Sequence, residues 1–196
     1  MKTQSFNPAL LNDAKNGSVA RRTKRLEDLP FASLILGVDP GLHRTGYGLV
    51  QVQSSRRPQF IEAGFLKAKA NDPMPVRLQT LFDGLCEVIK EFEPEVVVIE
   101  DLFSTYQHPR SALLMAHARG VFLLAAQQSN VPVHSFLPNE VKQVIAGNGH
   151  ANKAAMQAAV KARLKLAAVP EPPDVADALA IALCFAARQE TVARLK

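Results

Sequence analysis

The stretch Leu34-Ile35-Leu36-Gly37-Val38-Asp39-Pro40-Gly41 is the most informative part of this 196-residue chain. It is a short apolar run that ends in an acid and a Pro-Gly pair. Such a run is typical of a central strand whose carboxyl end carries a functional group. A second run over 96–100 is β-branched and also ends on a carboxylate, Glu100. If the two strands are parallel neighbours, Asp39 and Glu100 converge at one edge of a sheet.

Strands and helices alternate through the rest of the chain. Apolar and β-branched runs predict further strands over 45–52, 59–66 and 131–136. Apolar residues at helical spacing predict helices over 74–92, 111–128, 139–146, 151–166 and 174–188, with Asp174 as the N-terminal cap of the last. The resulting order, βββ-α-β-α-β-α-α-α, predicts an α/β domain in which helices flank a mixed five-stranded sheet. It is the pattern of the ribonuclease H-like fold.

Composition and charge restrict the class of protein. With 47% hydrophobic and 21% charged residues, the chain has the balance of a folded domain. It has no apolar run of the roughly 20 residues that a membrane helix needs, so we expect no membrane partner. Two cysteines without metal-ligand spacing and a start unlike a secretory signal indicate a cytoplasmic protein.

The N-terminal segment differs from the remainder. Its first thirty residues are polar, lack periodicity, and hold +3 of the net charge of +5. We interpret residues 1–32 as a flexible basic tail and residues 33–190 as one folded domain. Because the domain itself is close to neutral, the overall charge says little about nucleic-acid binding.

Two further acids, Asp174 and Asp177, are three residues apart at the start of an otherwise apolar helix. This spacing places them on one helical face, and an apolar helix docks against a sheet, which would carry both acids inward. Four converging carboxylates repel one another unless a cation neutralises them. Oxygen ligands without cysteine or clustered histidine favour Mg²⁺ or Mn²⁺. Two such ions could support phosphodiester hydrolysis.

Each acid also has a purely structural interpretation. Asp174 suits a helix cap, Asp39 before Pro-Gly suits a turn, and Asp177 suits a surface ion pair. Glu100 is harder to explain in this way, because a charge at the end of a buried strand is costly unless it is neutralised. Residue types and spacing alone leave both interpretations open.

The segment 141–170 carries basic residues and no acid. Its cations are Lys142, Lys153, Lys161, Arg163 and Lys165. A stretch of one sign over thirty residues can face phosphates, and it can equally be a solvated helical face. Charge alone does not separate the two.

Six motifs in order resemble the RuvC family of Holliday-junction resolvases. They are Leu-Gly-Val-Asp-Pro-Gly at 36–41 with Thr-Gly-Tyr-Gly at 45–48, Val-Ile-Glu-Asp-Leu-Phe at 98–103, Ala-Arg-Gly at 118–120, Glu-Val-Lys-Gln at 140–143, Gly-Asn-Gly at 147–149, and Asp-Val-Ala-Asp-Ala-Leu-Ala at 174–180. The resemblance covers about 34–188. A single motif of this kind also occurs in actin-like ATPases, whereas six in order are specific.

The resemblance implies roles for seven residues. Asp39, Glu100, Asp174 and Asp177 fall on the family's metal-binding catalytic acids. Phe103 falls on an aromatic residue that stacks with a base at the junction, although core packing is the alternative for this residue alone. Lys142 and Lys153 fall on basic residues that the family uses against DNA.

The resemblance also implies an activity and its partners. It implies a homodimer that cuts four-way (Holliday) DNA junctions by paired symmetric hydrolysis, with two Mg²⁺ ions per subunit and Mn²⁺ as an alternative. It further implies work beside the RuvA–RuvB branch-migration complex in DNA recombination and repair. Two other hypotheses are a junction-binding module without catalysis and an actin-like phosphotransferase. The second would need a repeated phosphate loop, for which this chain is too short.

Overall fold

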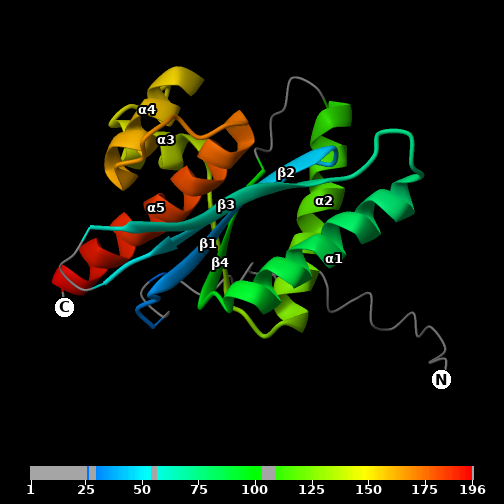
Figure 1. Ribbon diagram of the computed structural model, residues 1–196, viewed down its shortest axis with the longest axis horizontal. Helices are drawn as coiled ribbons and strands as arrows, with labels where there is room; N and C mark the ends of the chain where they lie inside the picture. The colour runs from blue at the N-terminus through cyan, green and yellow to red at the C-terminus, as the bar shows by residue number, and fades with distance from the viewer. Residues whose placement is uncertain (1–25, 27–29, 54–56, 103–108, 196) are drawn as a thin grey trace, which may run out of the picture.

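The computed structural model describes residues 26, 30–53, 57–102 and 109–195, without the side chains of 109 and 110. Figure 1 shows the arrangement of the strands and helices. The strands are β1 (Leu34–Asp39), β2 (Arg44–Gln51), β3 (Gln59–Lys67), β4 (Val96–Glu100) and β5 (Val133–Phe136). The helices are α1 (Met74–Phe92), α2 (Pro109–Gln128), α3 (Pro138–Ala146), α4 (Lys153–Leu164) and α5 (Pro173–Arg194).

The five strands form one mixed sheet in the order β3-β2-β1-β4-β5. The first three strands are antiparallel neighbours, as their close spacing in sequence predicts. From β1 outward, β4 and β5 are added in parallel. The predicted α/β architecture, a mixed five-stranded sheet flanked by helices, is therefore confirmed.

Each face of the sheet packs against its own layer of helices. In Figure 1, α1 and α2 lie on one face, and α5 crosses the other with α3 and α4 against it. Alternation along β1 explains the division, because successive side chains point to opposite faces. Ile35 packs in the core with α3, α4 and α5. Leu36 and Val38 pack in the core with α1 and α2.

Glycines let α5 lie unusually close to the sheet. A Cβ atom at Gly37 of β1 would lie 2.1 Å from the carbonyl oxygen of Ala178 in α5. A Cβ atom at Gly46 of β2 would lie 1.9 Å from the carbonyl oxygen of Asp174. Real Cβ atoms do not approach this closely, so any larger residue would displace the helix or the strand. The backbone of α5 therefore rests directly on β1 and β2.

The start of α5 corrects one prediction. The N-cap residue is Pro172, no side chain caps the helix, and Pro173 takes the first helical position. Proline suits that position because its φ angle is already helical and its missing N–H is not needed there. Asp174 therefore lies inside the first turn, where a carboxylate favours the positive end of the helix dipole. The prediction that Asp174 caps the helix was wrong.

The N-terminal boundary shows a contact between distant parts of the chain. Ala32, which the expected division assigns to the tail, is buried. Its N–H donates to Gln189 Oε1 at 3.1 Å, and Gln189 Nε2 donates to its carbonyl oxygen at 2.9 Å. The last helix thus holds the chain immediately before β1. Within the described residues, every helix is too short or too polar to cross a membrane.

Candidate active site

Two of the predicted site residues lie side by side at the end of the sheet. In the parallel ladder, Val38 of β1 pairs with Ile99 of β4, so Asp39 and Glu100 are the next residues along each strand. Neighbouring strands lie about 5 Å apart. Alternation from Val38 and Ile99, which belong to the α1–α2 core, turns both acids toward α5. The condition on which the expected convergence of Asp39 and Glu100 depends, that the two strands are parallel neighbours, is met.

The close approach of α5 brings the other two acids to this edge. Asp39 pairs with Gly46 in the antiparallel ladder between β1 and β2. Because the Asp174 backbone lies against Gly46, it lies one strand from Asp39. Asp177 follows three residues later on α5. All four predicted acids are therefore at one end of the sheet.

The acids influence one another electrostatically. Burial raises the pKa of Asp39 well above its usual value, and Glu100, Asp177 and Asp174 raise it further. Burial, with the charge of Asp177, raises the pKa of Glu100 to about 7. Burial also raises the pKa of Asp177. Such clustered and poorly hydrated carboxylates need a neutralising partner to stay ionised together.

Two lysines supply part of this neutralisation. Lys153 lowers the pKa of Asp177 and of Asp39, and Lys142 lowers that of Glu100 and of Asp177. Lys142 lies in α3, and Lys153 is the first residue of α4 after the N-cap Asn152. The positive charge of Lys153 is unfavourable at the positive end of the α4 dipole. Residues that break such a local rule are often found at functional sites. These two lysines of the acid-free segment therefore lie beside the acids.

The carboxylates are near one another without pointing at a common centre. Among the described residues, no three His, Cys, Asp or Glu side chains are arranged to hold one metal ion. One reason is the partner of Asp174, whose carboxylate accepts a hydrogen bond from Arg44 Nε in an ion pair. Asp174 would have to exchange this partner to bind a metal with the other three acids.

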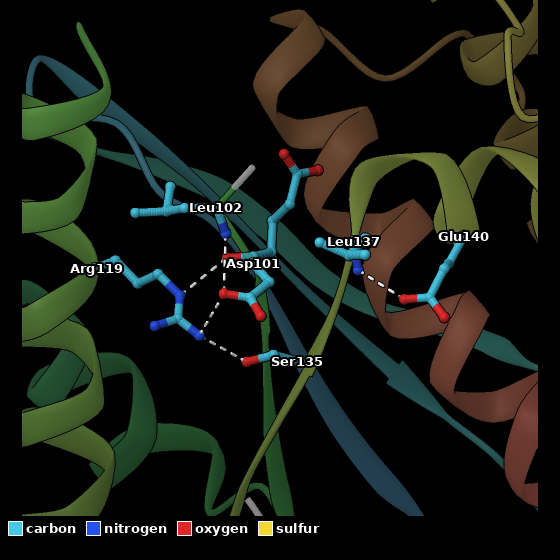
Figure 2. Close-up of polar contacts among 7 residues, drawn as sticks. Asp101, Leu102, Arg119, Ser135, Leu137 and Glu140 are labelled. Atoms are coloured by element: carbon cyan, nitrogen blue, oxygen red, sulfur yellow. Dashed lines mark hydrogen bonds and ion pairs between the residues drawn. The ribbon is translucent and has the colours of Figure 1, made fainter. Parts of the chain in front are cut away.

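Arg119 is a residue of the site region to which the sequence assigned no role. From α2 its Nε donates to the carbonyl oxygen of Glu100 at 3.2 Å, and its Nη2 donates to Ser135 Oγ of β5 at 2.9 Å. The same Nη2 lies 3.2 Å from Asp101 Oδ1. Figure 2 shows this guanidinium between Asp101 and Ser135. Arg119 thus ties the end of β4 to its neighbours in the sheet and to α2.

Part of the prediction falls on residues that the structure does not describe. Phe103, the expected stacking residue, is outside the described residues, as is most of the expected tail at 1–32. The remaining six predicted site residues are all described. Arg44 and Arg119 could not be found from sequence, because their partners are 130 and 16–19 residues away.

The mixed sheet, its helical layers and the acid-lined strand ends define a protein with the ribonuclease H-like fold. Residues 35–185 match the family model described as crossover junction endodeoxyribonuclease RuvC. The RuvC of Rhodopirellula baltica is 48% identical over 153 residues, which cover 78% of this chain and 85% of that protein. The RuvC of Desulforamulus reducens is 41% identical over 153 residues, covering 78% and 93%.

A solved structure agrees with these relatives. Thermus thermophilus RuvC, in complex with a Holliday junction substrate, is 35% identical with a TM-score of 0.74. The match covers 81% of this chain and 97% of that one. The chain therefore belongs to the RuvC family of crossover junction endodeoxyribonucleases, as the six motifs predicted.

Proposed function

We propose that this protein is a metal-dependent endonuclease that resolves four-way DNA junctions by paired symmetric phosphodiester hydrolysis. Its catalytic and metal-binding residues are Asp39, Glu100, Asp174 and Asp177. The observation that carries this assignment is the convergence of two strand-end acids beneath the helix that bears the other two. The proposed roles are recombination and DNA repair, with a four-way junction as substrate.

The donor set fits hard divalent cations. It consists of carboxylates whose pKa values are raised by burial and by one another, so a bound cation would relieve their repulsion. Cys86 lies in α1 on the other face of the sheet, and Cys184 lies seven residues, about two turns, after Asp177 on α5. We assign two Mg²⁺ ions per subunit, with Mn²⁺ as an alternative. When bound, such ions activate water and stabilise the leaving oxygen.

The surrounding residues position the acids and the DNA. Lys142 and Lys153 place positive charge beside Glu100, Asp177 and Asp39, where a phosphodiester would enter. The apolar core beneath α5 and the glycines of β1 and β2 fix the helix over the strand ends. Phe103, three residues beyond Glu100, is proposed to stack with a base at the junction.

Helix α2 supports a homodimer. Its inner face is buried, yet Leu113 and Leu124 are 62% and 49% exposed. Gly120 lies between these two leucines on the same face of the helix, seven residues after Leu113 and four before Leu124. Apart from the backbone of its own helical turns, a Cβ atom at Gly120 would have no neighbour within 4 Å among the described residues. A glycine in mid-helix costs about 1 kcal/mol relative to alanine, so close approach by a second copy would explain it.

The remaining assignments rest on the family. We propose that residues 1–32 form a basic tail before a nuclease domain at 33–190. We also propose a cytoplasmic location and cooperation with the RuvA–RuvB complex. Pull-down of RuvA–RuvB by the full chain, with and without junction DNA, would test that partnership directly.

The decisive experiment uses a labelled four-way junction with Mg²⁺ and no ATP. We expect two symmetric nicks that ligase can seal, and no cleavage in the presence of a chelator. Asp177→Asn and Glu100→Gln are expected to lose cleavage while binding the junction in Ca²⁺. Asp83→Asn, an exposed acid of α1, is the matched control and should cut normally. Full cleavage by Asp177→Asn in Mg²⁺ would refute the site.

The same assay separates the alternative, a catalytically silent junction-binding module. That module would bind the junction and leave it intact in Mg²⁺ and in Mn²⁺. The retained cluster of four acids favours the nuclease, because maintaining repelling carboxylates at one sheet edge has a cost in stability that binding alone does not require.

A further inference from the structure

A second charged pocket lies beside the acids, at the ends of β2 and β3. Arg44 of β2 pairs with Lys67 of β3, and Gly46 pairs with Phe65. Alternation turns Arg44, Phe65 and Lys67 to the same face as α5. They line a cavity of about 500 Å³ whose wall also includes Asp174. This pocket therefore shares one carboxylate with the proposed catalytic site.

Arg44 connects the two sites. Its guanidinium forms the ion pair with Asp174 and lies 5.8 Å from the centre of the Phe65 ring. The Arg44 side chain is 43% exposed, and Asp174 is 24% exposed. A solvent-accessible ion pair of this kind contributes little to stability, so it can be exchanged at little cost. The aromatic ring would keep the guanidinium in the pocket after such an exchange.

The wall of the pocket is supported by a buried arginine. Arg77 of α1 is 8% exposed, and its Nη2 donates to the carbonyl oxygen of Leu42 and contacts His43 Nδ1, both at 3.2 Å. Leu42 and His43 line the pocket. Among the described residues Arg77 has no ion pair with an acid, and its buried Nε has no hydrogen-bond partner. A buried cation without an acid adds to the positive potential on this side of the acids.

We propose that this pocket binds one phosphate of the DNA strand next to the scissile phosphodiester, through Arg44 and Lys67. In the free protein Asp174 is the ion-pair partner of Arg44. When Asp174 turns to the metal ions, Arg44 is released and takes the DNA phosphate as its new partner. This inference rests on the proposed nuclease function and deepens it, because metal loading and strand binding would be coupled through one arginine.

Charge and geometry select a phosphate as the occupant. The charged lining residues are Arg44, Lys67 and Asp174, so transfer of Asp174 to a metal leaves two cations and no acid. An arginine fork matches phosphate geometry with two parallel hydrogen bonds. Phe65 is 45% exposed and provides an apolar wall for the adjoining sugar. Asp174 lines the pocket and is also one of the proposed catalytic acids, so one strand would cross both sites.

The first test measures junction affinity in Ca²⁺ over a range of salt concentrations. Each lost phosphate contact lowers the slope of log affinity against log salt by about 1. We expect this loss for Arg44→Gln and for Lys67→Gln. Lys90→Gln, an exposed lysine near the far end of α1, removes the same charge and should leave the slope unchanged.

The second test measures Mn²⁺ binding without DNA by titration calorimetry. Arg44→Gln frees Asp174, so we expect it to bind Mn²⁺ several-fold more tightly than the wild type. Lys67 forms no ion pair with an acid among the described residues, so Lys67→Gln should change Mn²⁺ affinity less than Arg44→Gln does. Arg44→Gln would thus strengthen metal binding and weaken DNA binding, an opposite pair of effects that misfolding does not produce.

The outcomes are distinguishable from failure of the proposed function. Suppose that the wild type cuts junctions, but that Arg44→Gln and Lys67→Gln show the same salt slope as Lys90→Gln. This result would overturn the phosphate pocket and leave the nuclease function standing. If Arg44→Gln binds Mn²⁺ no more tightly than Lys67→Gln does, the proposed exchange of Asp174 between Arg44 and the metal ions is overturned. A wild-type protein that neither binds nor cuts junctions would overturn the nuclease function and the pocket together.

Discussion

Arg119 Nε donates a hydrogen bond to the backbone carbonyl of Glu100, 3.2 Å away, across 19 residues of sequence. The bond is to the main chain of the proposed catalytic acid, so it fixes where the strand ends without neutralising the carboxylate. Because the same guanidinium also binds Ser135 and Asp101, it holds three positions of the sheet edge in one geometry. Arg119 is therefore a positioning residue.

Replacing Arg119 with lysine is expected to weaken metal binding and cleavage about 10- to 100-fold, as loss of residues that orient metal ligands usually does. Lysine keeps the charge but lacks the planar fork that reaches three partners. Calorimetric Mn²⁺ titration and single-turnover cleavage measure the effect. Arg188→Lys, at an exposed position of α5, is the control. A lower melting temperature with unchanged Mn²⁺ affinity would show a purely structural role.

Stability without metal should depend on pH through Glu100. Its pKa rises from 4.5 to about 7 on folding, so between these values the folded state binds more protons than the unfolded state. The free energy of unfolding in chelator should therefore fall as pH rises from about 4.5 to about 7, by up to about 3 kcal/mol. Urea denaturation at several pH values measures it.

The variant Glu100→Gln removes this titration and should make the fall shallower. A dependence of the same sign should remain, because burial also raises the pKa values of Asp39 and Asp177. Identical pH profiles for the wild type and Glu100→Gln would contradict the burial of an ionisable Glu100.

Lys142→Gln should move the acid limb of the pH–rate profile to higher pH. Lys142 lowers the pKa of Glu100 and of Asp177, so without it these carboxylates ionise, and become able to bind metal, only at higher pH. Initial cleavage rates from pH 5.5 to 9 test this shift. Lys161→Gln, in α4, removes the same charge and is the matched control, because Lys161 is not among the charges that shift the pKa values of Asp39, Glu100 and Asp177. An equal fall in rate at every pH would instead indicate a role confined to DNA binding.

Gly37→Ala should destabilise the fold severely, by about 3 kcal/mol or more, because its methyl group would meet the Ala178 carbonyl oxygen at 2.1 Å. Denaturant unfolding measures this loss. Gly149→Ala is the matched control, since its Cβ would meet its nearest atom, the Asn139 carbonyl oxygen, at 3.4 Å, an ordinary contact. A Gly37→Ala protein as stable as the wild type would show that α5 does not rest on the strand.

Leu124→Glu should dissociate the proposed dimer. It introduces a charge on the exposed apolar face of α2, where burial against a second copy would leave the carboxylate unpaired. Sedimentation over a range of protein concentrations measures the dissociation constant, which we expect to rise at least tenfold. Val76→Glu replaces an apolar residue of similar exposure on α1 and should leave the assembly unchanged. A dimer unaffected by Leu124→Glu would place the interface elsewhere.

The sequence predicts the strand-end acids well for a local reason. A buried strand tolerates a carboxylate only at its end, so Asp39 and Glu100 mark where β1 and β4 stop. The sequence left the adjacency of the two strands as a condition, and the ladder between Val38 and Ile99 meets it. Helix ends were less accurate: α2 begins at Pro109 and α5 continues to Arg194, each beyond its predicted bound.

The parts that the sequence could not supply depend on distant contacts. Asp174 was expected to cap its own helix, yet its carboxylate pairs with Arg44 on another element. No local pattern encodes that choice, because it follows from the approach of α5 to β2 at Gly46. Arg119 was visible within a motif, but its function depends on a backbone atom of β4, which carries no side-chain signature.

The direct contact of α5 with the glycines of β1 and β2 limits how this enzyme can be altered. Since no side chain separates the helix from the strands at Gly37 and Gly46, no exchange of side chains there can bring the two pairs of acids closer. Their spacing is set by backbone thickness. Selection or engineering for a smaller metal ion would therefore have to act through the rotamers of the acids and through the surrounding loops, because the distance between helix and sheet is already minimal.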